Sequence, residues 1–298
     1  MIIDVHTHIG EYPKHWTYHA IGPDSVASNR GLTVEELKEK YTITWDKYMA
    51  DRENAGVEKS VIMALDQTRI CKMCLPDDYV YEFVRRNPEK LIGFSGIEPI
   101  DSTGKFKNGC LKQVEKAVNE YGFKGVGELG PVYSHYYPND KTIYPVYQKA
   151  LELEVPVCIH LGSSPIKFVE ARYMDPIYVD DVARDFPDLK IDIAHVGYPR
   201  TQETLAMMRV RPNIYSDISA LCPRTTILTW NLVMAKEYGV IDRIMFGTDI
   251  PSCMPTRNYV EWIRTMLNKQ AERSGWPTFS QKEIDGILGE NAARFLGI

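Results

Sequence analysis

Short runs of apolar residues, most of them rich in Val and Ile, alternate along the chain with amphipathic stretches. Eight of these runs have the length and composition of buried strands, and helical spacing of apolar positions fills most of the intervals between them. Such alternation predicts a parallel sheet, and eight units predict a closed (β/α)8 TIM barrel of the α/β class, as one domain over residues 1–298. The expected strands span residues 2–8, 59–65, 91–97, 125–129, 155–160, 190–195, 213–218 and 243–248.

Two helix starts are predicted from their capping residues. Thr33 with Glu36, and Ser280 with Glu283, have the capping-box spacing, in which a hydroxyl and a carboxylate satisfy backbone donors at a helix entrance. The second start predicts a C-terminal helix that continues to about residue 295.

An irregular stretch follows the first expected strand. Residues 10–32 are rich in aromatic side chains and are too many for an ordinary strand-to-helix turn. We expect an insertion over about residues 10–45 that folds over the site as a lid, with a simple surface excursion as the alternative.

Charge and hydropathy exclude several classes of function. Thirty-five Lys and Arg against 40 Asp and Glu give a net charge of −5, and no basic patch suits a nucleic-acid backbone. No apolar run reaches bilayer length, and the first residues do not resemble a signal peptide, so we expect a cytoplasmic protein without a membrane partner. The six scattered cysteines favour reduced thiols over a disulfide framework.

Polar side chains occur where several expected strands end. His6 and His8 are two residues apart in a strand, so they project from the same face. His160, His195 and Asp249 close the fifth, sixth and eighth strands, and the carboxyl ends of barrel strands are where active sites form. The pattern therefore predicts one site built from several strands.

The residue types at this site favour a metal-dependent enzyme. Imidazoles and a carboxylate suit a divalent ion such as Zn²⁺, with a position left open for water. The water becomes acidic when bound, Asp249 is placed to accept its proton, and His195 is placed to polarise a substrate oxygen or to move a proton.

The ordered set of these motifs resembles the amidohydrolase superfamily over essentially the whole chain. It consists of residues 4–8 (DVHTH), His160, residues 195–197 (HVG), residues 246–249 (FGTD) and residues 289–296 (GENAARFL). Residues 185–190 (DFPDLK) are similar to the amidohydrolase-2 branch, which includes hydrolases and decarboxylases such as aminocarboxymuconate-semialdehyde decarboxylase. The resemblance implies metal binding by His6, His8, His160 and Asp249, with His195 as the catalytic histidine. It also leaves a homodimer open as the assembly.

The fourth expected strand departs from the pattern of binuclear members, which bridge two ions with a carboxylated lysine. Glu128 stands near that strand end, either as a metal ligand that permits a second ion or as a carboxylate that orients a histidine or a substrate group. The loop residues Arg69, Arg172, Arg224 and His135 are candidates to bind a small-molecule substrate, the arginines through a carboxylate.

Three functions remain open at this point. The first is hydrolysis of an amide, lactone or similar bond by metal-activated water. The second is non-oxidative decarboxylation or hydration of an unsaturated or aromatic acid, which a single ion would serve. The third is a barrel that keeps the metal without catalysis.

Overall fold

All eight expected strands are present in the computed structural model, which describes residues 1–298. Each is shorter than the sequence pattern suggests, because most of the flanking residues lie outside the strand ladders, in connections, single bridges or short helical turns. Two further strands, which lie outside the barrel, form a short antiparallel hairpin that the sequence pattern does not reveal. The barrel strands are β1 (Ile3–Thr7), β2 (Lys59–Met63), β5 (Leu91–Phe94), β6 (Val126–Leu129), β7 (Val157–Ile159), β8 (Ile191–Ile193), β9 (Ile214–Asp217) and β10 (Ile244–Met245).

The barrel strands are parallel and follow one another in chain order. β1, β2 and β5 form one ladder, and β6 to β10 form another. A parallel bridge from Ser95 to Val126 joins the two ladders on one side. On the other side the Val5 amide donates to the Phe246 carbonyl at 3.0 Å, next to a bridge from Thr7 to Ile250. The expected (β/α)8 barrel is thereby confirmed.

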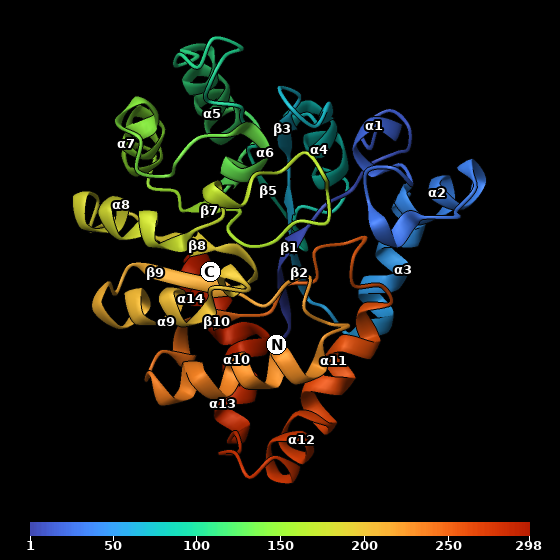
Figure 1. Ribbon diagram of the computed structural model, residues 1–298, viewed down its shortest axis with the longest axis vertical. Helices are drawn as coiled ribbons and strands as arrows, with labels where there is room; N and C mark the ends of the chain where they lie inside the picture. Colours follow the sequence, from blue (N-terminus) through green and yellow to red (C-terminus); the bar gives the residue numbers. More distant parts are fainter.

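Helices surround the strands, as Figure 1 shows in a view in which the strands lie at the centre. None of them has both the length and the hydrophobicity needed to cross a bilayer. They are α1 (Tyr18–Ile21), α2 (Val34–Tyr41), α3 (Trp45–Ala55), α4 (Asp77–Val84), α5 (Gly109–Asn119), α6 (Pro131–Ser134), α7 (Tyr144–Glu152), α8 (Val179–Asp185), α9 (Thr201–Val210), α10 (Thr225–Glu237), α11 (Thr256–Thr265), α12 (Leu267–Arg273), α13 (Gln281–Asp285) and α14 (Asn291–Leu296).

Both expected capping boxes are formed. The hydroxyl of Thr33 accepts from the Glu36 amide at the start of α2, and Ser280 and Glu283 repeat the arrangement at α13. A π-helical turn over Gly286–Glu290 joins α13 to α14, so the C-terminal helical path ends one residue beyond the expected position. Helix α14 contacts β1, and its apolar residues belong to the buried cluster that contains the apolar residues of that strand.

Residues 10–45 contain α1 and α2, which lie together at one side of the barrel (Figure 1). Four side chains from the segment 10–45 line the cavity beside the strand ends: Trp16, Ile21, Val26 and Tyr41. The hairpin of β3 (Leu65–Gln67) and β4 (Met73–Leu75) borders the same cavity.

The expectation that every cysteine is reduced is wrong. Cys222 and Cys253 form a disulfide that joins the connection after β9 to the connection after β10. The two residues are 31 positions apart in the chain, and the sequence carries no local pattern that would reveal their proximity. Cys71, Cys74, Cys110 and Cys158 are free.

Removing this disulfide is expected to destabilise the protein. A cross-link over 31 residues lowers the entropy of the unfolded chain, which corresponds to about 3–4 kcal/mol of unfolding free energy. The double variant C222S/C253S should therefore unfold at lower denaturant concentration than the oxidised protein, and the reduced protein should match it. Cys74→Ser is the control, and equal midpoints for C222S/C253S and the oxidised protein would contradict the prediction.

Candidate metal centre

The structure brings the expected strand-end residues together in one buried cluster. The Nε2 atoms of His6 and His8 are 3.2 Å apart, and Oδ1 of Asp249 is 3.7 Å from Nε2 of His8. Nε2 of His195 is 3.2 Å from Nδ1 of His160. All four histidines are nearly inaccessible to solvent, whereas Asp249 is partly exposed. The cluster lies at the carboxyl ends of the strands, as the sequence predicts.

The hydrogen bonds of His6 and His8 direct one ring nitrogen of each toward the other. Nδ1 of His6 lies 2.9 Å from Oδ2 of Asp217, and Nδ1 of His8 lies 3.0 Å from the carbonyl oxygen of Met63. Both partners are acceptors, so each Nδ1 carries a hydrogen and Nε2 is the ring nitrogen left to bind an ion or a proton. The two Nε2 atoms face one another at 3.2 Å and define a place for a positive charge.

The electrostatics of the cluster agree with this geometry. Burial opposes a charge on His6, but the carboxylates of Asp217 and Glu128 raise the pKa of His6 well above its usual value. Nε2 of His6, Nε2 of His8 and a carboxylate oxygen of Asp249 all lie within 4.8 Å of one another. Imidazole nitrogen and carboxylate oxygen are donors that divalent Zn²⁺ and Mn²⁺ accept, so the residues fit such an ion.

Glu128, at the end of β6, lies among the histidines. Its Oε1 accepts a hydrogen bond from Nδ1 of His160 at 2.7 Å and is 3.5 Å from Nε2 of His6. Oε2 is 3.6 Å from Nε2 of His8. Burial opposes its charge, but His160 and His6 hold the pKa of Glu128 well below its usual value. The carboxylate thus orients a histidine and also lies within reach of an ion at His6 and His8.

His160 differs from the other three histidines. Its Nδ1 is engaged by Glu128, and its Nε2 is 3.3 Å from the hydroxyl of Tyr133. It does not belong to either compact group of donor atoms around His6, His8, Glu128, His195 and Asp249. In this arrangement the His160 ring contacts the cluster at its edge.

A chain of hydrogen bonds through Ser219 and Asp217 positions the His195 ring. Its Nδ1 donates to Oγ of Ser219 at 2.7 Å, and that hydroxyl donates to Oδ1 of Asp217. The backbone of His195 lies in the left-handed region with a φ of 59°, a conformation that costs energy in most residues and occurs often at functional sites. The His195 ring borders the cavity, and its Nε2 lies 3.2 Å from Nδ1 of His160 and 3.6 Å from Oε1 of Glu128.

The charges around His195 favour its protonated form. Burial lowers the pKa of His195, but the nearby carboxylates of Glu128, Asp249 and Asp217 together raise that pKa above its usual value. Because Nδ1 is hydrogen-bonded to Ser219, Nε2 is the ring nitrogen of His195 that remains to donate or accept a proton.

Asp4 supports the cluster without entering it. Its Oδ1 accepts from the amides of Thr248 and His6 at 3.0 and 3.2 Å, and its Oδ2 accepts from the Thr248 hydroxyl at 2.6 Å. Arg52 on α3 pairs with Asp4 and with Asp51, and all three side chains are buried. This network fixes the segment that carries His6 against the segment that carries Asp249.

Two cavities meet at the cluster. The inner cavity spans about 650 Å³, including space open to solvent, and apolar and aromatic side chains such as Trp16, Leu65, Met73 and Tyr133 border it together with the polar residues of the cluster. The amide of Gln67 also borders it, and Oε1 of that buried side chain has no hydrogen-bond partner. The outer cavity, about 1050 Å³, continues from His160, His195 and Asp249 to more polar residues.

The four loop residues considered for substrate binding are placed differently. Arg224 lines the outer cavity. Arg69 donates to the carbonyl of Ser134, Arg172 pairs with Glu170, and His135 lies 3.1 Å from the carbonyl oxygen of Phe168. None of these three borders either cavity at the cluster.

Several residues of the site were not identified from the sequence. Asp217 ends β9 and Ser219 follows it, much as His195 follows β8, so the rule of polar residues at strand ends would have found them. Tyr133, Lys40 and Gln67 carry no such signal, because they come from segments outside the barrel strands.

The family comparison covers almost the whole chain. The model of the amidohydrolase family, in its second branch, matches residues 3–298. No curated protein sequence matches the chain. An uncharacterised TIM-barrel protein from Bordetella bronchiseptica superposes with a TM-score of 0.70 at 21% identity, over 99% of this chain and 98% of the other.

Two further solved structures with known names share the fold. A dihydroxybenzoic acid decarboxylase from Polaromonas sp. JS666, with bound manganese and 2-nitroresorcinol, has a TM-score of 0.68 at 16% identity, over 99% of this chain and 96% of the other. A 4-oxalomesaconate hydratase from Rhodopseudomonas palustris has a TM-score of 0.61 at 21% identity, over 100% and 96%. The chain therefore belongs to the amidohydrolase-2 branch of the amidohydrolase superfamily and is an enzyme of that superfamily.

Proposed function

We propose that the protein is a metal-dependent, non-oxidative decarboxylase of an unsaturated or aromatic carboxylic acid. The observation that carries the proposal is the position of His195: its ring borders a cavity that has an apolar and aromatic portion, and it lies beside the donor atoms of His6, His8 and Asp249. The apolar side chains can hold the carbon skeleton of a substrate beside the His195 ring, so that the ring can protonate a carbon atom.

The residues that would hold the ion are His6, His8 and Asp249, with Glu128 and His160 at the edge of the set. A bound divalent ion supplies Lewis acidity to the oxygen atoms of a substrate. We propose one ion, Zn²⁺ or Mn²⁺, because Glu128 is held by His160 and no lysine stands at the end of β6. The manganese of the Polaromonas decarboxylase supports Mn²⁺, whereas Zn²⁺ is proposed from the imidazole and carboxylate donors alone.

His195 would supply the proton that replaces the carboxylate. The proton of Nε2 passes to the carbon that bears the carboxylate, and the bond between that carbon and the carboxylate breaks. The electron pair of the broken bond returns to the unsaturated system, and the products are carbon dioxide and the shortened substrate. Solvent at the outer cavity returns a proton to His195, whose Nδ1 stays hydrogen-bonded to Ser219 throughout.

The inner cavity would select the apolar part of the substrate. Trp16, Tyr133 and Met73 offer flat or adaptable surfaces to an unsaturated or aromatic group. The unpartnered Oε1 of Gln67 would accept a hydrogen bond from a hydroxyl group on that part of the substrate. Together they favour a hydroxylated aromatic or enolic acid over a saturated one.

Carbon dioxide release tests the proposal. The protein is loaded with Zn²⁺ or Mn²⁺, its metal content is measured, and it is incubated with hydroxybenzoates and muconate-type acids. We expect release of carbon dioxide from at least one acid, and loss of that release after chelation of the metal.

The same assay separates decarboxylation from the other reactions of the superfamily. A panel of lactones and amides is run beside the acids, and uptake of water by unsaturated acids is followed by mass. Opening of a lactone or amide by the fully metal-loaded protein, with no carbon dioxide from any acid, would replace decarboxylation by hydrolysis. Addition of water without loss of carbon would identify a hydratase.

A further inference from the structure

Two cationic side chains border the outer cavity and have no carboxylate partner. Lys40 lies on α2 and Arg224 lies in the connection after β9, and neither forms an ion pair. Asp249 is the one acidic residue among the residues that border this cavity. Both side chains are exposed to solvent, so the outer rim of the cavity carries two cations against one carboxylate, in a protein with a net charge of −5.

Lys40 is positioned by a buried amide. Its ammonium group donates to Oδ1 of Asn29 at 2.7 Å and lies 5.1 Å from the centre of the Tyr41 ring. Asn29 is completely buried and is itself fixed, because its Nδ2 donates to the Ile21 carbonyl at 2.6 Å and lies 2.8 Å from the Tyr41 hydroxyl. An ammonium group has three donors, and this contact with Asn29 uses only one of them.

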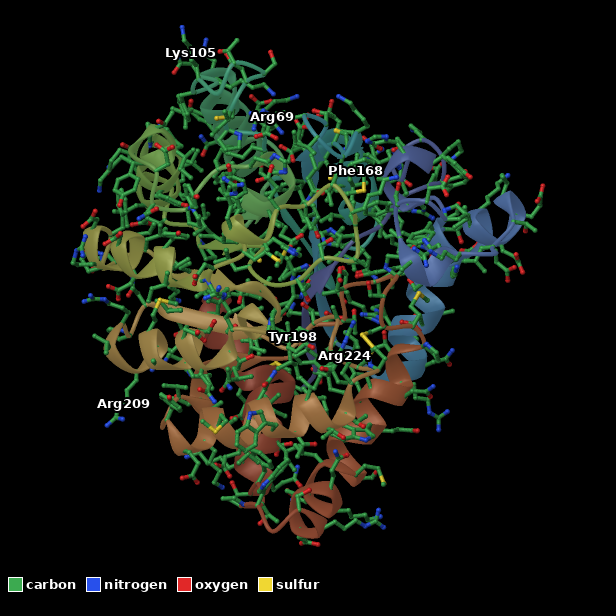
Figure 2. All side chains as sticks on the ribbon, in the orientation of Figure 1. Arg69, Lys105, Phe168, Tyr198, Arg209 and Arg224 are labelled. Carbon is green, nitrogen blue, oxygen red and sulfur yellow. A yellow bond between two sulfur atoms is a disulfide. The ribbon has the colours of Figure 1, made fainter.

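Arg224 is positioned by its own connection. One guanidinium nitrogen donates to the carbonyl of Ala220 at 2.8 Å, and the group lies 5.8 Å from the centre of the Tyr198 ring. Figure 2 shows Arg224 and Tyr198 close to one another near the middle of the molecule, whereas Arg209 points away from its edge. The remaining N–H groups of the Arg224 guanidinium form no hydrogen bond within the chain, so a planar anion can engage them.

We propose that Lys40 and Arg224 form a second anion subsite, which binds a carboxylate of the substrate remote from the reacting one. The inference rests on the proposed function, because the reacting carboxylate is placed at His195 and the donor cluster. It narrows the substrate class to dicarboxylic unsaturated or aromatic acids. A substrate of this kind spans the cavity, with one acid group at the cluster and the other at its outer, positive part.

The test compares binding of two probes, benzoate and isophthalate, to the metal-loaded protein by titration calorimetry. Isophthalate adds one carboxylate to the same ring. A charge-assisted hydrogen bond corresponds to a change of about 10-fold to 100-fold in affinity. We expect wild-type protein to bind isophthalate tighter than benzoate by about this factor. We expect Lys40→Met and Arg224→Met each to remove much of the difference while benzoate affinity stays within about twofold.

The control variants remove cations outside the cavity. Lys38→Met is on the same helix as Lys40, and Arg209→Met is on α9. Both side chains are exposed, as those of Lys40 and Arg224 are, but neither borders the cavity, so both variants should bind the probes like wild type. Equal affinities of wild-type protein for the two probes would overturn the subsite, as would an unchanged preference in the double variant K40M/R224M.

The outcome for the subsite is separable from that for the reaction. A preference for isophthalate that depends on Lys40 and Arg224 supports the subsite even if no acid releases carbon dioxide, and in that case only the proposed reaction fails. Release of carbon dioxide from monoacids, without any preference for isophthalate, would overturn the subsite and leave the reaction standing.

Discussion

Replacing His195 by asparagine is expected to lower kcat by about 10²–10⁴-fold, the usual contribution of a general acid. Asparagine has no group that can deliver a proton, but it tolerates the left-handed backbone conformation in which His195 is held, so the fold should be preserved. The amide of residue 195 keeps its hydrogen bond to Asp217. Steady-state turnover of the acid identified by carbon dioxide release, together with metal content, checks this prediction.

The metal content of two variants distinguishes a residue that donates a proton from a residue that binds the ion. The His195→Asn protein should keep its ion, because His6, His8 and Asp249 remain as donors. The matched variant Asp249→Asn also keeps a left-handed backbone residue, but it removes a proposed ligand, so both metal content and turnover should fall. Turnover of His195→Asn within about tenfold of wild type would exclude the assigned role, since that loss is smaller than general acids contribute.

Replacing Arg52 by methionine is expected to lower the unfolding free energy by about 3–5 kcal/mol, the usual effect of leaving buried charges without their partner. The change leaves the carboxylates of Asp4 and Asp51 in the protein interior without their counter-ion. Burial already raises the pKa of Asp4 although Arg52 opposes this, so removal of the guanidinium adds to the cost of the charged form. Denaturant unfolding of the two proteins measures the difference.

An exposed ion pair provides the control. Arg85 pairs with Glu82 on the surface, and Arg85→Met should change the unfolding free energy by less than about 1 kcal/mol. Adding Asp4→Asn to Arg52→Met should recover part of the lost stability, because one of the two uncompensated charges is removed. If Arg52→Met costs no more than Arg85→Met, then the buried network does not stabilise the barrel.

The barrel could be predicted from the sequence because its strands are local patterns. Each run of Val and Ile is buried on both faces, so the pattern is continuous and its repetition determines the class of fold. The hairpin of β3 and β4 was missed, because its strands have three residues each and contain Asp66, Gln67 and Cys74. A strand of three residues is too short to show the alternation of apolar and polar positions that identifies a strand in a sequence.

The centre of the site was predictable for a related reason. The central residues all stand at strand ends: His6, His8, His160, His195 and Asp249. A closed barrel brings the carboxyl ends of its strands to one edge, independently of how the surrounding helices are arranged. The walls of the cavities come from connections, whose paths are set by tertiary contacts. Lys40 is an ordinary lysine in the sequence, and only the position of α2 gives it a place at the cavity.

The disulfide has a mechanical consequence for the site. Cys222 lies two residues before Arg224, and Cys253 lies four residues after Asp249. The connection that carries Arg224 is therefore tethered covalently to the connection that carries Asp249. The cross-link limits how far either connection can move independently of the other, so it restricts the motion of a cavity-lining residue, Arg224, relative to Asp249.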